Sequence, residues 1–239
     1  MFERAKKTFG DAAQSVTADI RGSEFKPHSF ELDISKHGDP YQLDGGRTLT
    51  LVGSIDRVDM TDDGYAKIVD YKSGSQEFSL ENMYNGLSLQ LPVYASAVKA
   101  KDPDVTIAAM YYLKVGVPEV EDKSQTGITD DEYQSKLSRY YSRDGVFSAD
   151  ENITARLDTQ NIKSGRIFPQ DKIDKLIDFT KEKIIETGSG IMSGNTDISP
   201  LTDKPCKYCD YKAVCAIEGK DGCIRTLERL PDDFLEEVE

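Results

Sequence analysis

Apolar and polar residues recur along this chain with two different periods. The first is the period of an amphipathic helix, and over residues 2–20 it lines up these apolar side chains: Phe2, Ala5, Phe9, Ala12 and Val16. The second is the two-residue period of a half-buried strand, and it begins with Phe30, Leu32 and Ile34, which alternate with acidic residues. We therefore expect a leading helix whose apolar face packs on the core, followed by a strand.

A hairpin and a helix are predicted next. Residues 48–60 read as one long apolar strand, TDDG at 61–64 is typical of a tight turn, and residues 65–71 return as the second strand. Residues 78–99 repeat apolar side chains at helical spacing, with a bend or break expected at Pro92. A third buried strand, IAAMYYLKV, follows. The local order is therefore strand, strand, helix, strand.

The second half of the chain has a weaker pattern. It predicts a loop over 118–127, a short helix over 130–141, a strand or loop over 152–165, and a helix over 169–187. A turn-rich stretch, a group of cysteines and an acidic run come after that helix. The chain therefore divides into three parts, which are a lead-in helix (1–26), an α/β core (27–200) and an irregular, cysteine-bearing end (201–239).

Composition and charge narrow the class of protein. A chain of 239 residues with 38% hydrophobic content can bury the core of one large domain or two small ones. No apolar run approaches the roughly 20 residues of a membrane span, and no signal peptide opens the chain, so we expect a cytoplasmic protein. The net charge of −13 is unusual for a protein that binds phosphates. Either a basic groove is local, or a partner chain supplies most of the contact with nucleic acid.

The predicted hairpin carries candidate catalytic residues. Asp70 and Lys72 lie two positions apart on one strand, so their side chains share a face, and Asp56 on the preceding strand can lie opposite them. Two carboxylates can hold Mg²⁺ or Mn²⁺, which lowers the pKa of bound water and neutralises charge on a phosphate. Lys72 can orient the water or stabilise the transition state. The pattern predicts a metal-dependent nuclease.

An ordinary ion pair at a strand end is the alternative, and the Asp-x-Lys spacing alone would favour it. The setting favours a site instead, because the strand is apolar and a buried ion pair is costly unless it is used or well paired. Gln90 and Tyr94 share one face of the following helix, where they could contact a phosphate, a base or the lysine. The alternative for this pair places Tyr94 in the core and Gln90 in solvent.

Three further residues near the hairpin carry polar side chains, and their expected roles differ. Glu31 on the first strand is a candidate further ligand for the metal or the water, and a solvated strand face explains it equally well. Arg57 and Asp59 flank Asp56 and are expected to form a structural pair.

All four cysteines lie near the C-terminal end, at Cys206, Cys209, Cys215 and Cys223. Clustering in a cytosolic protein indicates metal rather than a disulfide framework, which would scatter them. Thiolates at this spacing can bind zinc or an iron–sulfur cluster, and the spacing alone does not separate the two. Reduced structural cysteines are the remaining alternative.

Three motifs carry a family resemblance: GSIDRVD at 53–59, IVDYKSG at 68–74 and LQLPVY at 89–94. They resemble the RecB-type nucleases of the PD-(D/E)XK superfamily, and most of all the AddB-type nuclease domains of bacterial AddAB helicase–nucleases, over about residues 25–227. The resemblance implies a restriction-endonuclease-like α/β core, with a central mixed sheet flanked by helices. It also implies metal ligands at Asp56 and Asp70, a catalytic Lys72, and motif residues at Gln90 and Tyr94.

The sequence PCKYCDYKAVC at 205–215 resembles the cluster-binding end of the same family. That resemblance implies a [4Fe–4S] cluster on Cys206, Cys209 and Cys215, which would pin the C-terminus to the core. In the family, a fourth cysteine and a motif histidine lie upstream, and this sequence has neither there. We therefore expect a fragment that starts after those elements, in which Cys223 would at most substitute as the fourth ligand.

The resemblance implies a DNA exonuclease within a helicase–nuclease that processes double-strand breaks for recombinational repair. It implies an AddA-type partner subunit and cutting of the 5′-ended strand as it emerges from a duplex end. One alternative is a stand-alone iron–sulfur nuclease of the CRISPR-adaptation type, against which the missing upstream cysteine argues. Another is a catalytically idle DNA-end-binding or scaffold domain, against which Asp56, Asp70 and Lys72 argue.

Overall fold

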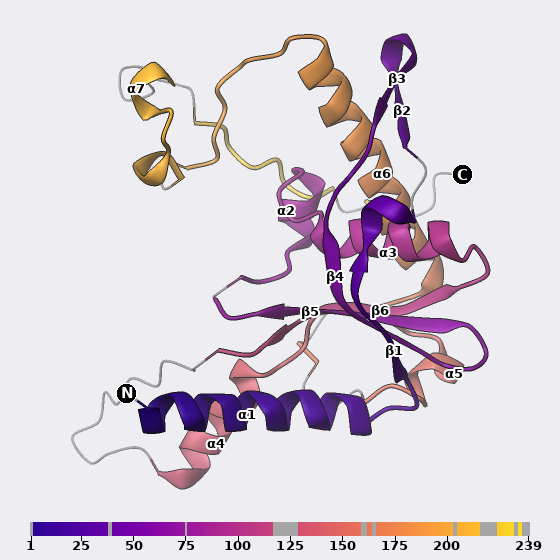
Figure 1. Cartoon of the computed structure of the whole chain (residues 1–239), viewed down its shortest axis with the longest axis vertical. Helices are drawn as coiled ribbons and strands as arrows, with labels where there is room; N and C mark the ends of the chain where they lie inside the picture. The colour runs from indigo at the N-terminus through magenta and orange to yellow at the C-terminus, as the bar shows by residue number, and fades with distance from the viewer. Residues whose placement is uncertain are drawn as a thin grey trace.

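A six-stranded mixed sheet forms the centre of the protein (Figure 1). The computed structural model describes residues 2–37, 40–74, 76–116, 129–158, 162–163, 166–202, 205–215, 224–231 and 234–235. The strands of the sheet, in spatial order, are β1 (Lys26–Asp33), β4 (Ser54–Met60), β5 (Tyr65–Lys72), β6 (Thr106–Lys114), β7 (Asp144–Ser148) and β8 (Ile167–Phe168). Pairing is parallel for β5 with β6 and for β7 with β8, and antiparallel elsewhere in the sheet. The expected mixed sheet is confirmed.

Helices cover both faces of this sheet. Figure 1 shows α1 (Phe2–Arg21) along one face and α3 (Gln90–Lys101) and α6 (Gln170–Met192) along the other. The remaining helices are short: α2 (Leu80–Tyr84), α4 (Asp130–Tyr140), α5 (Glu151–Thr154) and α7 (Lys212–Cys215), with single 3₁₀ turns η1 (Ile34–Lys36), η2 (Asp44–Gly46) and η3 (Pro205–Tyr208). None of the helices in the described ranges is long and apolar enough to span a bilayer.

The two faces of the sheet bury separate apolar clusters. The larger cluster joins the sheet to α3 and α6 through residues such as Ile68, Leu91 and Ile173. The smaller one lies on the α1 face and includes Val69 and Tyr111. Strand β6 contributes to both clusters, because it runs in the middle of the sheet beside a parallel neighbour. That position explains why its sequence is continuously apolar rather than alternating.

Two predicted elements are each divided in the structure. The strand expected over 48–60 is split into β3 (Arg47–Leu49), which pairs with β2 (Tyr41–Leu43) outside the main sheet, and β4. The helix expected over 78–99 is split into α2 and α3, and the break lies before Pro92 rather than at it. Gly86 has φ 76° after α2, a conformation that glycine tolerates best. Pro92 lies in the first turn of α3, where its missing N–H is not needed.

Other boundaries also differ from expectation. Strand β7 was not predicted. Residues 151–154, at the start of the strand or loop expected over 152–165, form the short helix α5. The final long helix continues to Met192 instead of ending at 187. Phe9 was expected on the inner face of α1, and its side chain is 76% exposed. The loop expected over 118–127 lies outside the described residues.

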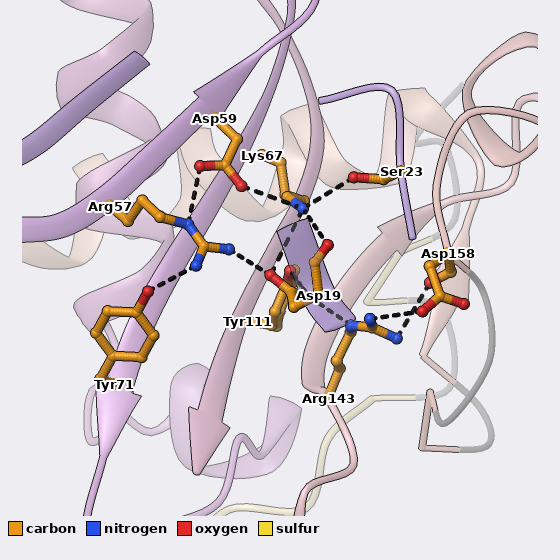
Figure 2. A network of polar contacts seen from close by, with 9 residues as sticks. All are labelled: Asp19, Ser23, Arg57, Asp59, Lys67, Tyr71, Tyr111, Arg143 and Asp158. Atoms are coloured by element: carbon orange, nitrogen blue, oxygen red, sulfur yellow. Dashed lines mark hydrogen bonds and ion pairs between the residues drawn. The ribbon is translucent and has the colours of Figure 1, made fainter. Parts of the chain in front are cut away.

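Helix α1 is joined to the sheet by buried charges (Figure 2). The carboxylate of Asp19, 2% exposed, forms ion pairs with Arg57 of β4 and with Arg143, whose Nε lies 2.7 Å from Asp19 Oδ1. Tyr111 of β6 donates its hydroxyl to the same oxygen at 2.6 Å. Burial by itself would raise the pKa of Asp19, but the charges of Lys67 and Arg143 and the hydrogen bond of Tyr111 lower it to about 2.

Asp19 is therefore expected to make stability depend on acid pH. Because its folded pKa lies below the ordinary value, it stabilises the fold above about pH 4, and this contribution is lost as the pH falls toward about 2. The contribution is about 2 kcal/mol. We expect the difference in free energy of unfolding between the parent and Asp19→Asn to shrink between about pH 4 and pH 2, as measured by urea denaturation. Asp11→Asn, on the same helix but without the contacts of Figure 2, is the control, and parallel curves for parent and Asp19→Asn would contradict the prediction.

Candidate active site

Asp56, Asp70 and Lys72 come together where β4 and β5 separate. The pairing of these strands ends with Arg57 opposite Val69, so Asp56 and Asp70 lie just beyond the last paired residues. The Oδ2 atom of Asp56 accepts the backbone N–H of Tyr71 at 2.6 Å, which draws its carboxylate across to β5. The hairpin therefore places both predicted carboxylates beside each other.

Asp70 and Lys72 form a close ion pair on the α3 side of the sheet. The ammonium of Lys72 lies 2.6 Å from Asp70 Oδ2, and Asp70 is only 2% exposed. Burial raises the pKa of Asp70; the hydrogen bond and charge of Lys72 oppose the rise, and the negative charge of Asp56 adds to it. The pKa of Asp70 remains raised, chiefly because burial disfavours its charged form more than Lys72 stabilises it.

Gln90 and Tyr94 continue the site onto α3. Lys72 Nζ donates to Gln90 Oε1 at 2.9 Å, and Gln90 Nε2 donates to the hydroxyl of Tyr94 at 2.9 Å. Tyr94 is 7% exposed and belongs to the apolar core, while its hydroxyl points into this chain of hydrogen bonds. Among the alternatives left open by the sequence, this geometry favours contact between Gln90 and the lysine. The break before α3 is what sets Gln90 at the first turn of the helix, facing β5.

Glu31 lies on the same side but is not joined to the two aspartates. Its carboxylate accepts the hydroxyl of Ser54 at 2.9 Å, and its φ of 49° is unusual for a residue other than glycine. Burial raises the pKa of Tyr94; the hydrogen bond from Gln90 opposes this, and the charges of Asp70, Asp56 and Glu31 add to it. Glu31 is therefore near enough to influence the site electrostatically, and its role as a ligand stays a prediction.

The two aspartates suit a divalent cation. No group of three or more His, Cys, Asp or Glu side chains that could hold a metal occurs in the part of the chain that the structure describes. Mg²⁺, however, is usually held by one or two carboxylates together with water and substrate phosphate. Asp56 and Asp70 supply two carboxylates of that kind, and the negative charge of Asp56 adds to the rise that burial causes in the pKa of Asp70.

The cysteine segment lies apart from this site. Figure 1 shows η3 and α7 away from the sheet, beyond the C-terminal end of α6. Cys206 and Cys215 are half-buried and Cys209 is exposed, and all three are free thiols. They are not brought together as a metal site within the described ranges, and Cys223 lies outside those ranges. The iron–sulfur cluster therefore stays a prediction that this geometry does not support.

Most of the polar contacts on the α1 side of the hairpin were not predicted from the sequence. Arg57 and Asp59 were expected to pair, and their Nε and Oδ1 atoms lie 2.8 Å apart. The participation of Asp19 and the bonds of Tyr71 to Asp56 and Arg57 were not foreseen. One available signal was a buried-face position: Asp19 lies three residues after Val16, on the apolar side of the predicted helix. A backbone donor such as the N–H of Tyr71 has no sequence signal.

Comparison with known proteins bears directly on this site. The model of the PD-(D/E)XK nuclease superfamily matches residues 2–216, which include the whole hairpin and α3. Proteins named as the B subunits of ATP-dependent helicase/deoxyribonucleases are similar. The one from Alkaliphilus metalliredigens is 29% identical over 98% of this chain and 23% of its own length. The one from Clostridium kluyveri is 27% identical over 97% of this chain and 23% of its own length. The one from Thermoanaerobacter pseudethanolicus is 28% identical over 90% of this chain and 21% of its own length.

This chain thus spans a little over a fifth of the length of these relatives. The relatives agree with the resemblance carried by the three sequence motifs, and the observed mixed sheet agrees with the fold that it implied. Since the family match takes in most of the sequence and every predicted site residue from Asp56 to Tyr94, the chain belongs to the PD-(D/E)XK nuclease superfamily.

Proposed function

We propose that this chain is a deoxyribonuclease domain that hydrolyses phosphodiester bonds with Mg²⁺ or Mn²⁺ held by Asp56 and Asp70. The observation that carries the proposal is the meeting of two carboxylates and a lysine at the end of the β4–β5 hairpin. Two carboxylates beside one lysine leave room in the charge balance for a cation at that point. Membership of a nuclease superfamily supports the same reaction.

The residues of the site have separate tasks in this proposal. A bound divalent cation would supply Lewis-acid stabilisation of phosphate charge and a lower pKa for the attacking water. Lys72, fixed by Asp70 on one side and Gln90 on the other, holds an ammonium where charge develops on the phosphate. Tyr94 fixes the rotamer of Gln90 and so keeps the lysine in place. Because these contacts exist before substrate binds, little reorganisation is needed during the reaction.

The wider assembly is also a proposal. The similar proteins are named as B subunits of ATP-dependent helicase/deoxyribonucleases, and this chain corresponds to a little over a fifth of the length of such a protein. We infer an AddA-type partner subunit, a role in recombinational repair of double-strand breaks, and cutting of the 5′-ended single strand. The net charge of −13 supports this, since a partner or an adjoining domain would then provide most of the basic contact with DNA.

Nuclease activity should depend on the Asp70–Lys72 pair. With labelled single-stranded DNA and Mn²⁺, we expect Asp70→Asn and Lys72→Met to lower the rate of nucleotide release by about a hundredfold or more. The matched control is Lys99 with Asp174, an ion pair of the same 2.6 Å length between α3 and α6, outside the site. Lys99→Met and Asp174→Asn should keep the parent rate. A parent protein that releases no more nucleotide than Asp70→Asn would show that this chain is not a nuclease by itself.

Gln90 should affect the rate through the position of Lys72. Removing its amide in Gln90→Leu frees the lysine, and we expect kcat to fall about tenfold with little change in the Mn²⁺ concentration needed for half-maximal activity. Gln170→Leu is the control, because Gln170 also begins a helix and donates a hydrogen bond, to the carbonyl of Ile107 at 3.2 Å. Equal loss of activity in both variants would mean that Gln90 only supports the fold.

The cysteine motif is proposed to hold a [4Fe–4S] cluster. Support comes from the resemblance of PCKYCDYKAVC at 205–215 to the cluster-binding end of the family, since the cysteine spacing alone suits zinc equally well. Anaerobically purified protein should then be coloured and contain about four iron atoms per chain, and Cys209→Ala should lose the iron. A colourless parent, or one that contains zinc, would exclude the cluster in this chain.

A further inference from the structure

A chain of buried polar contacts runs directly behind the candidate site (Figure 2). Arg57 follows Asp56 on β4, and Tyr71 lies between Asp70 and Lys72 on β5. Because side chains alternate along a strand, Tyr71 points to the α1 face while its two neighbours point to the α3 face. There, Arg57 Nη1 donates to the hydroxyl of Tyr71 at 2.6 Å.

The strand pairing alone does not set the distance between Asp56 and Asp70. The ladder of β4 and β5 ends at Arg57 and Val69, and both aspartates lie beyond it. Tyr71 bridges this gap twice: its backbone N–H donates to Asp56 Oδ2, and its hydroxyl accepts from Arg57. One residue therefore ties β5 to β4 from both faces of the sheet, at the position where the two carboxylates meet.

Arg57 is itself held rigidly. Its side chain is 0% exposed; Nη1 donates a hydrogen bond to Tyr71 and Nη2 one to Asp19, while Nε forms an ion pair with Asp59 Oδ1 at 2.8 Å. The planar guanidinium fits these partners in one orientation only. Asp59 is fixed in turn by Lys67, whose Nζ lies 3.1 Å from its Oδ2. The guanidinium of Arg57, which donates to the hydroxyl of Tyr71, is therefore held in place by its contacts with Asp19 and Asp59.

We propose that Tyr71 is a positioning residue, which through Arg57 fixes Asp56 beside Asp70 and so sets the affinity of the site for a divalent cation. This inference rests on the proposed function, because it concerns the metal ligands of that same site. Residues that orient metal ligands typically contribute about 10- to 100-fold to metal affinity or activity. Loss of the Tyr71 hydroxyl would let β5 move relative to β4 without removing any ligand.

The competing interpretation is that Tyr71 only stabilises the fold, and Tyr111 provides the comparison. Tyr111 belongs to the same network and is fully buried, whereas Tyr71 is half-buried; the hydroxyl of Tyr111 donates to Asp19 Oδ1 at 2.6 Å. It lies on β6, however, and has no hydrogen bond to Asp56, Asp70 or Lys72 in the described structure. Tyr71→Phe and Tyr111→Phe thus each remove one hydroxyl from the same network. Tyr71 is connected to Asp56 of the site, and Tyr111 is not.

The test is a titration of metal-stripped protein with Mn²⁺ in the absence of DNA. Binding is measured from the electron paramagnetic resonance signal of the free ion. We expect Tyr71→Phe to raise the Kd for Mn²⁺ about tenfold or more. Tyr111→Phe should keep the Kd within about twofold of the parent, even if it lowers the free energy of unfolding as much, as measured in urea. Asp59→Asn is a second variant that loosens Arg57 without touching Tyr71, and it should weaken binding in the same direction.

The outcomes separate this inference from the proposed function. If the parent binds Mn²⁺ no better than Asp70→Asn, the proposed metal site itself is wrong. If the parent binds and both Tyr71→Phe and Asp59→Asn keep its Kd, the positioning role is overturned. It is also overturned if Tyr111→Phe weakens binding as much as Tyr71→Phe, because the effect would then follow general stability.

Discussion

The separation of β4 from β5 beyond Arg57 and Val69 is the constraint on which the rest of the site depends. A continuous ladder would give Asp56 and Asp70 the fixed spacing of paired residues and would use the backbone N–H of Tyr71 for strand pairing. Because the pairing of the strands ends there, that N–H is free to donate to the carboxylate of Asp56.

The two faces of the hairpin carry opposite electrostatic balances. On the α1 face, the residues drawn in Figure 2 include three cations, Arg57, Lys67 and Arg143, and three carboxylates, Asp19, Asp59 and Asp158. Because equal numbers of positive and negative side chains lie in close contact, their ion pairs offset the free-energy cost of burying the charges. We therefore assign this face to stabilising the fold. On the α3 face, Asp56 and Asp70 lie beside each other, and among the described residues Lys72 is the cation that pairs with Asp70. That deficit of positive charge suits binding of a cation.

Much of the site could be predicted because its chemistry is local in the sequence. The turn at 61–64 brings the strands of the hairpin together, the two-residue period places Asp70 and Lys72 on one face, and helical spacing does the same for Gln90 and Tyr94. The break before α3 and the division of the 48–60 strand were not predictable from periodicity. The division of the strand accompanies packing against an element distant in the chain, since Gly188 of α6 lies close to Leu43 of β2 and Leu49 of β3, whereas the break before α3 follows the positive φ of Gly86.

The sequence by itself determined which chemical groups this protein can use and the order in which strands and helix present them, because side-chain periodicity is a local property of the backbone. The tertiary structure alone decided how those groups are held. The ion pairs of Asp19 on α1, the contact of Tyr71 with Arg57, and the hydrogen bond between Lys72 and Gln90 all join separate elements. Such contacts arise only when the sheet and its two helical layers are assembled, and no periodic pattern encodes them.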